Sequence, residues 1–220
     1  MLPKKYFVLL VDLAGSQDLP DRENGTRKLK EAINNLNKDF RDDLYAPMEI
    51  TRGDEAAAVL KRITTLHEML LNFMIKLQPF KCRMVITYNV LTAGLGSKRS
   101  TEIDGPGFYE ADTLMHKLKK SHKLFAIGTD NPVLDSAISS IINLVLLRWE
   151  EMTPFQRKVI HLYAQGIKQD DIANVVKRTQ QQVSQVVRAV SYDILREAEE
   201  SLKALIDELQ SNLRERSANG

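Results

Sequence analysis

Residues 153–192 read TPFQRKVIHLYAQGIKQDDIANVVKRTQQQVSQVVRAVSY, and this stretch decides the fold of the C-terminal part of the chain. Thr153 supplies an N-cap, and Pro154 follows in the first helical turn, where a missing N–H costs nothing. Gly166 suits the left-handed conformation that ends a helix, and Thr179 is a second N-cap. Apolar residues recur at helical spacing after each of these starts. The stretch therefore predicts three short helices arranged as a helix-turn-helix.

The second and third of these helices each have an apolar side in the prediction. These sides consist of Ile172, Ala173, Val175 and Val176, and of Val183, Val186, Val187 and Val190. The polar face and the turn before it hold Lys177, Arg178, Thr179, Gln180, Gln181, Gln182, Ser184, Gln185 and Arg188. Glutamine and arginine read base edges in a major groove, and serine and glutamine also bind phosphates.

The predicted polar face is locally basic, because no acidic residue lies between Asp171 and Asp193. We therefore expect double-stranded DNA as a partner. An ordinary three-helix subdomain with a solvated polar face is the alternative. Lys177 stands where glycine is usual in such turns, and Arg178 where a small apolar residue is usual. These two residues either weaken the turn or contact phosphates.

Composition sets wider limits on the protein. The 220 residues suffice for one large or two small domains, and 43% hydrophobic with 27% charged residues is ordinary for a globular protein. A net charge of +2 is too small for non-specific coating of nucleic acid. Cys82 is the one cysteine in the sequence, so an internal disulfide framework is excluded. It lies in an apolar run, as a packed core thiol would.

Two apolar segments could be read as a targeting or membrane segment, and neither fits. The run from Tyr6 to Val11 is shorter than a signal-peptide core and ends at Asp12. The segment 141–147 is too short to span a bilayer. We expect a cytoplasmic protein without a membrane partner.

Residues 6–127 alternate strand-like and helix-like segments. Strands are predicted at 6–12, 48–51, 56–60, 82–92 and 124–127, and helices at 21–40, 63–77 and 108–121. This order predicts an α+β fold: a ferredoxin-like sheet with two helices on one face, extended at its C-terminal end. The turn sequence GTDNP at 128–132 marks the best domain boundary. The predicted parts are a domain over 1–130, a connecting helix over 131–151, the helix-turn-helix over 152–192 and a C-terminal helix over 193–220.

The C-terminal helix has a heptad-like seam formed by Leu195, Ala198, Leu202, Leu205 and Leu209. Its length is marginal for an independent coiled coil, so the helix either pairs with a second copy or packs back on its own domain. A homodimer is attractive because two half-sites need two recognition helices.

Asp12 ends the first predicted strand, and Asp54 lies in the hairpin sequence RGDE. If the two strands are neighbours, both carboxylates emerge at one end of the sheet. Two carboxylates that close repel each other unless a cation lies between them. Mg²⁺ or Mn²⁺, held together with the phosphates of a nucleotide, is the usual solution.

These segments resemble the catalytic domain of class III nucleotide cyclases. The predicted order of strands and helices in residues 6–127 is also nucleotide-cyclase-like. CRMVITYNVLTAG (82–94) and DGPGFYEADTLMHKL (104–118) are similar to a cyclase strand and the helix after it. With a helix-turn-helix after it, the whole chain resembles the bacterial SatD family, whose hallmarks are DLAGSQDLPDR, RGDE and DGPGFY. The resemblance implies Asp12 and Asp54 as metal ligands. Asp21 and Arg22 either order the turn after the first strand and cap its helix or, as the resemblance implies, contact a nucleotide ligand.

The sequence departs from the cyclase pattern where catalysis needs it most. Tyr109 and Thr113 stand where cyclases place an asparagine and an arginine, and losing that cation costs orders of magnitude in rate. Val85 and Asn89 replace glycines of the strand and narrow the space for a nucleotide. We therefore expect a domain without cyclase activity, in which the carboxylates either still bind a metal and a nucleotide or only bond loop backbone.

Three functions follow as hypotheses. The first is a DNA-binding transcriptional regulator with a cyclase-like domain for sensing or dimerisation. The second is a metal-dependent enzyme acting on nucleoside triphosphates. The third is a scaffold that uses the helix-turn-helix to bind a protein.

Overall fold

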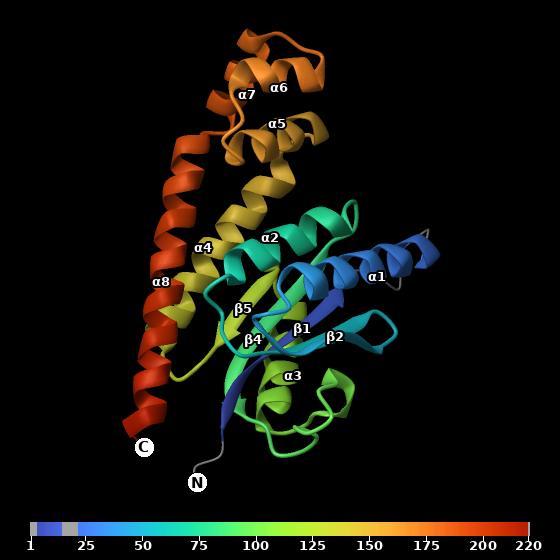
Figure 1. Ribbon diagram of the computed structural model, residues 1–220, viewed down its shortest axis with the longest axis vertical. Helices are drawn as coiled ribbons and strands as arrows, with labels where there is room; N and C mark the ends of the chain where they lie inside the picture. The colour runs from blue at the N-terminus through green and yellow to red at the C-terminus, as the bar shows by residue number, and fades with distance from the viewer. Residues whose placement is uncertain (1–3, 15–21, 220) are drawn as a thin grey trace. The chain divides into compact units, whose positions relative to one another are not determined.

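A five-stranded sheet organises the N-terminal unit of the computed structural model, which describes residues 4–14 and 22–219 (Figure 1). The strands are β1 (Lys5–Leu13), β2 (Leu44–Arg52), β3 (Glu55–Leu60), β4 (Cys82–Val90) and β5 (Phe125–Gly128). Their order across the sheet is β2-β3-β1-β4-β5, and among these described strands only β4 and β5 pair in parallel. The predicted α+β, ferredoxin-like arrangement is confirmed.

The edge strand β2 begins earlier than the predicted 48–51. Leu44, Ala46 and Met48 alternate toward the core, but exposed Pro47 interrupts the pattern. Proline is tolerated there because an edge strand leaves one row of N–H groups unpaired. A sequence pattern that treats proline as a break therefore misses the first half of β2.

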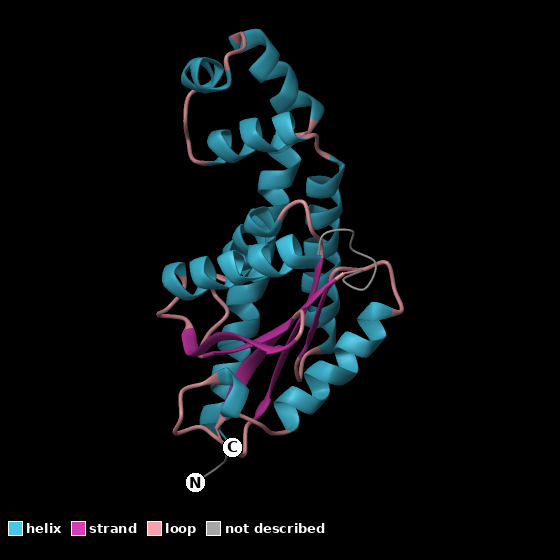
Figure 2. Cartoon of the chain, turned by 90° about the vertical axis from the view of Figure 1, so that its right-hand side faces the viewer, coloured by secondary structure: helices cyan, strands magenta, loops and turns pink. Residues whose placement is uncertain are grey.

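Helices cover both faces of the sheet (Figure 2). α1 (Arg22–Asp39) and α2 (Leu66–Leu77) pack together on one face, as predicted. α3 (Pro106–Lys119), which belongs to the C-terminal extension, packs on the other face. Tyr6 and Val8 of β1 join the apolar cluster of α3, whereas Phe7 and Leu9 point to the opposite face because side chains alternate along a strand. By the same alternation, Asp12 points to the α3 side.

α4 (Pro132–Glu151) begins along the free edge of β5. The Ser139 hydroxyl accepts a hydrogen bond from Ile127 N at 3.1 Å, and Asn143 Oδ1 accepts one from Phe125 N at 3.1 Å. Asn143 Nδ2 donates to the carbonyl oxygen of Phe125 at 2.8 Å. Polar side chains of α4 thus satisfy the backbone of an edge strand that would otherwise be open to another chain.

Length and composition make α4 the one helix of the described residues that is long and apolar enough to cross a membrane. The shorter apolar segment 141–147 considered from the sequence is only part of this 20-residue helix. Core helices of other proteins meet the same criterion, and Asp135, Ser139 and Asn143 within α4 hydrogen-bond to the β5 strand or to the turn after it.

α8 (Tyr192–Asn219) returns to the sheet-containing unit with its C-terminal part, from Leu202 onward. Its buried side chains there are Leu202, Ile206, Leu209 and Leu213. Gln210, 4% exposed, accepts a hydrogen bond through Oε1 from Ile63 N at 2.9 Å. Of the two alternatives left open by the sequence, the helix packs back on its own chain. Ile206, which lies off the heptad-like seam, is buried, and Leu205 is only half-buried.

The second unit, Leu144–Ser201, contains α5 (Pro154–Ala164), α6 (Gln169–Val176) and α7 (Gln180–Ala189). Val159, Ile160, Ile172, Val183 and Val190 lie in one apolar core. Val175 is 54% exposed, so its assignment to the apolar side of the second helix is wrong. The helix is only eight residues long and buries Ile172 and Ala173, whereas Val175 remains exposed.

Candidate functional site

Asp12 lies at the centre of an ionic cluster at one end of the sheet. It stands directly opposite Glu55 of β3 and opposite Arg83 of β4. Side chains of directly opposed residues share a face, so all three point to the side that α3 covers. The Asp12 side chain is 8% exposed, which makes its charge costly without a partner.

Lys119, in the last turn of α3, supplies the partner that the sequence interpretation missed. Its Nζ lies 2.7 Å from Asp12 Oδ1 and 3.1 Å from Glu55 Oε1. Arg83 Nη1 lies 3.6 Å from the other carboxylate oxygen, Asp12 Oδ2. The sequence carries a signal for this arrangement: Ala111, Met115 and Leu118 form the buried side of α3, and Lys119 follows directly after it.

Burial raises the pKa of Asp12, and the hydrogen bond and charge of Lys119 offset part of that rise. Burial opposes ionisation of Lys119, but its hydrogen bonds to Asp12 and Glu55 outweigh burial and raise the pKa of Lys119. The ammonium of Lys119 therefore stays charged. The two pKa shifts belong to one ion pair, in which the carboxylate is buried and the ammonium is partly exposed.

Asp54, the second predicted metal ligand, follows Gly53 in the turn between β2 and β3, where Gly53 has a φ of +58°. The Asp54 carboxylate repels the negative charge of Asp12 and so raises the pKa of the Asp12 carboxyl. The expected pair is thus near one end of the sheet. However, both oxygens of Asp12 face protein cations, and the described residues contain no group of three or more His, Cys, Asp or Glu side chains arranged for a metal. This donor set does not fit Mg²⁺ or Mn²⁺, whose oxygen ligands must approach the ion directly.

The two expected nucleotide contacts fall at the margin of the described residues. Asp21 lies outside them, and Arg22 is described only as the first residue of α1.

The α3 positions that differ from cyclases have local partners. The Tyr109 hydroxyl donates to Asp104 Oδ2 at 2.9 Å, and the Thr113 hydroxyl donates to the Tyr109 carbonyl oxygen at 2.8 Å. Asn89 donates through Nδ2 to Glu110 Oε1 at 2.7 Å, and Val85 is fully buried. These side chains serve the packing of α3 on β4 and offer no cation for a phosphate.

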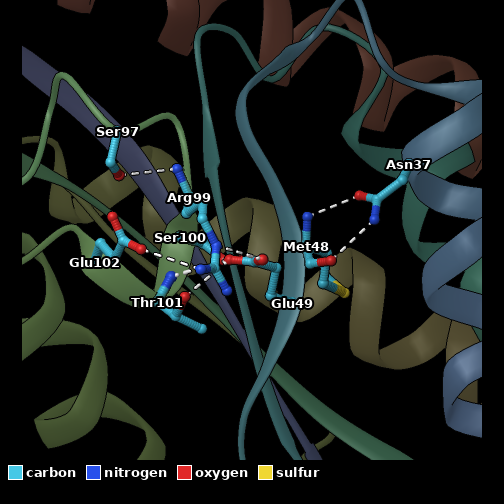
Figure 3. A network of polar contacts seen from close by, with 8 residues as sticks. All are labelled: Asn37, Met48, Glu49, Ser97, Arg99, Ser100, Thr101 and Glu102. Atoms are coloured by element: carbon cyan, nitrogen blue, oxygen red, sulfur yellow. Dashed lines mark hydrogen bonds and ion pairs between the residues drawn. The ribbon is translucent and has the colours of Figure 1, made fainter.

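A second polar network fixes the glycine-rich loop that follows β4 (Figure 3). Glu49 of β2 accepts hydrogen bonds from Thr101 N, the Thr101 and Ser100 hydroxyls, and Arg99 Nε. Burial opposes ionisation of Glu49, but the bonds from Thr101 and Arg99 outweigh it and lower its pKa. The loop is therefore tied to the sheet edge by one carboxylate, a role that its sequence did not reveal.

The helix-turn-helix has the caps that the sequence predicts. Thr153 with Gln156, and Thr179 with Gln182, each form a capping box in which side chain and backbone bond reciprocally. Gly166 takes a φ of +78° after α5. Lys177 takes the left-handed conformation at φ 53° between α6 and α7, where glycine is usual, so this lysine pays a conformational cost that the fold tolerates.

The predicted DNA-facing residues divide by what their side chains already do. The Gln182 amide closes the capping box, Gln180 donates to Gln169 Oε1 at 2.8 Å, and the Arg178 guanidinium lies 5.7 Å from the Phe155 ring centre. Ser184 is half-buried. Gln181, Gln185 and Arg188 are exposed, and their side chains make no hydrogen bond or ion pair with any described residue.

The chain is similar to several solved structures of nucleotide cyclases and of a cyclase-like protein. A bacterial light-regulated adenylyl cyclase is 12% identical with a TM-score of 0.40, over 56% of this chain and 74% of that one. The catalytic core of a rhodopsin-guanylyl cyclase with converted specificity, in complex with ATPalphaS, is 15% identical with a TM-score of 0.40, over 57% and 77%. A class III adenylyl cyclase-like ATP-binding protein from Pseudomonas aeruginosa is 12% identical with a TM-score of 0.43, over 63% and 36%.

No curated protein matches the chain. A family model described as the SatD family matches residues 6–206. This match spans nearly the whole of both units. The chain therefore belongs to the SatD family.

Proposed function

We propose that this protein is a DNA-binding transcriptional regulator, in which α7 enters the major groove of double-stranded DNA. One observation carries the proposal: Gln181, Gln185 and Arg188 lie exposed on α7 and are not engaged by other described side chains. Glutamine and arginine at such positions form the bidentate contacts that distinguish bases. Side chains already committed to the fold would have to give up those bonds before reading DNA.

The surroundings of α7 support phosphate contact. Lys177 and Arg178 lie in the exposed turn immediately before the helix, and no acidic residue occurs between Asp171 and Asp193. The N-terminal end of a helix also favours anions, because its N–H groups and dipole present positive charge. The turn therefore supplies positioning contacts, and the exposed side of α7 supplies base contacts.

The test begins with selection of a binding site from random double-stranded DNA, followed by fluorescence anisotropy over a salt series. Gln181→Ala and Arg188→Ala should each weaken specific binding by about 5- to 150-fold, the range of one good base contact. Lys177→Ala should weaken binding evenly across sequences and reduce the salt slope by about one. Arg214→Ala, an exposed arginine on α8, is the matched control.

Unchanged affinity in both α7 variants, with folding intact, would remove this face from the function. Binding of a protein ligand without the steep salt dependence of phosphate contacts would instead favour the scaffold hypothesis.

The cyclase-like unit is proposed to sense a ligand or to bring two copies together, without turnover. Support comes from Tyr109 and Thr113, whose hydroxyls are already bonded, and from Lys119, which neutralises Asp12. The experiment is incubation with each of the four ribonucleoside triphosphates and Mn²⁺, followed by chromatography. A cyclic or hydrolysed product that disappears in Asp12→Asn would establish the enzyme hypothesis instead.

Pairing of two copies would place two recognition helices on a two-fold symmetric site. The described part of the α8 seam does not supply the contact, because Leu202 and Leu209 are buried in their own chain. Sedimentation with and without the selected DNA measures the stoichiometry directly, and one copy per site would exclude the homodimer.

A further inference from the structure

The polar end of the sheet differs from an open metal site because two of its acidic residues, Asp12 and Glu55, already have cations. Asp12 and Glu55 contribute two negative charges, and Lys119 and Arg83 contribute two positive charges within 4 Å of them. A site for a divalent ion needs carboxylates whose charge is still unbalanced. These four groups are formally neutral together, and the Asp54 and Asp112 carboxylates, whose charges also act on this cluster, lie outside the two pairs.

The position of Lys119 explains how that neutrality arises. Its Nζ bridges two carboxylates from neighbouring strands, at 2.7 Å from Asp12 Oδ1 and 3.1 Å from Glu55 Oε1. These are hydrogen-bond separations, longer than the roughly 2.0–2.1 Å of Mg²⁺ to oxygen. A divalent ion bound between Asp12 and Glu55 would have to displace the ammonium and would meet the Arg83 guanidinium beside it.

We propose that Lys119 is a built-in cation that closes this carboxylate cluster, so that the natural protein takes no divalent metal there, and its removal uncovers a site. The uncovered site would take a hard divalent cation such as Mn²⁺, Mg²⁺ or Ca²⁺, which prefer carboxylate oxygens. Asp12 and Glu55 would be its ligands, and Asp54 lies near enough to contribute charge. The inference concerns the cyclase-like unit and does not depend on DNA binding by α7.

Mn²⁺ alone is the probe, because the loss of the free-ion signal in electron paramagnetic resonance reports binding directly. The full-length protein, Lys119→Ala, Lys119→Met and the double variant Asp12→Asn/Lys119→Ala are compared. Lys119→Met keeps most of the apolar stem and guards against a failure of Lys119→Ala to fold. Lys117→Ala, an exposed lysine on the same helix, is the matched control.

Both single variants at Lys119 should bind Mn²⁺ about tenfold or more tightly than the natural protein, and the double variant should lose that gain. Lys117→Ala should bind like the natural protein. The proposal is overturned if the natural protein binds Mn²⁺ in a manner abolished by Asp12→Asn. It is also overturned if folded Lys119→Ala and Lys119→Met bind no better than the natural protein.

A second measurement uses the natural protein only. Acetylation of lysines, read by mass spectrometry, should be slower at Lys119 than at Lys117, because two carboxylates hold the Lys119 ammonium in place. Addition of Mn²⁺ should leave that rate unchanged. Equal rates at the two lysines, or faster labelling of Lys119 with Mn²⁺, would show that the ammonium does not occupy the cluster. DNA affinity of the same variants is measured separately, so failure here leaves the function of α7 to its own test.

Discussion

The packing of α8 can be tested at two neighbouring residues that the sequence and the structure rank in opposite orders. Leu205 lies on the heptad-like seam, whereas Ile206 lies beside it. In the structure Ile206 is fully buried and Leu205 is half-buried. Ile206→Ala and Leu205→Ala remove the same number of carbon atoms, so chemistry is matched and only the environment differs.

The expected magnitude follows from burial. Truncation of a fully buried isoleucine to alanine costs about 2–5 kcal/mol, from lost transfer free energy and the cavity left behind. We expect about 3 kcal/mol for Ile206→Ala, and about 1 kcal/mol for Leu205→Ala, which keeps part of its surface in water. For a unit of this size each kcal/mol lowers the melting temperature by about 2–4 °C. The two variants should therefore differ by several degrees.

The assay is thermal unfolding, followed by circular dichroism at two widely different protein concentrations. The buried-helix structure predicts a larger loss for Ile206→Ala and a melting temperature that is independent of concentration. Lys203→Ala, on the exposed side of the same helix, should shift stability by less than about 0.5 kcal/mol. A larger loss for Leu205→Ala, together with a melting temperature that rises with concentration, would refute the packing and restore the coiled-coil dimer.

Three further predictions concern single residues in the two units. Thr179→Ala should lower the stability of the helical unit by about 1 kcal/mol, while Thr179→Ser keeps the cap, as thermal unfolding would measure. Gly94→Ala should destabilise by about 2 kcal/mol or more, because Gly94 has a φ of +73° and a Cβ there would lie 1.8 Å from the Glu102 carbonyl oxygen. Gly96→Ala, in open space, should be nearly neutral, and equal losses would contradict this account. The pKa of Glu49 is lowered from its ordinary value of 4.5, so ionised Glu49 contributes stability at pH values above 4.5. That contribution is lost as the pH falls through the folded-state pKa. Glu49→Gln should therefore lose stability at pH 7 and little at pH 3, and a pH-independent loss would argue against the network.

Much of the fold was accessible from local patterns. The strand Lys5–Leu13 contains the continuous apolar run from Tyr6 to Val11, as strands covered on both faces do, and the start signals at Thr153 and Thr179 correspond to capping boxes in the structure. The prediction placed the edge strand β2 at 48–51, whereas it begins at Leu44 and contains Pro47. Proline is a break in an interior strand and is acceptable at an edge, and only the strand order shows which case applies.

The candidate site was accessible only in part. Asp12 and Asp54 were found because strand ends and Gly-Asp turns have local signatures, and the structure places both at one end of the sheet. Lys119 was missed because a lysine at a helix end is common and most such lysines are solvated. Its significance depends on which strand residue lies under the helix, which no local pattern contains.

The sequence by itself determined the type and order of the elements, the three helix-turn-helix helices and the acid-free surface before α7, because neighbouring residues encode propensity, periodicity and capping. Tertiary structure decided what occupies each surface. It brought Lys119 to Asp12, Glu49 to the loop after β4, and Gln210 to Ile63, pairs that lie far apart in the chain. Such pairings arise when buried faces pack and unmatched charges or N–H groups must find partners. That requirement is set by the whole fold, so the lysine ammonium beside Asp12 could not be found from local sequence patterns.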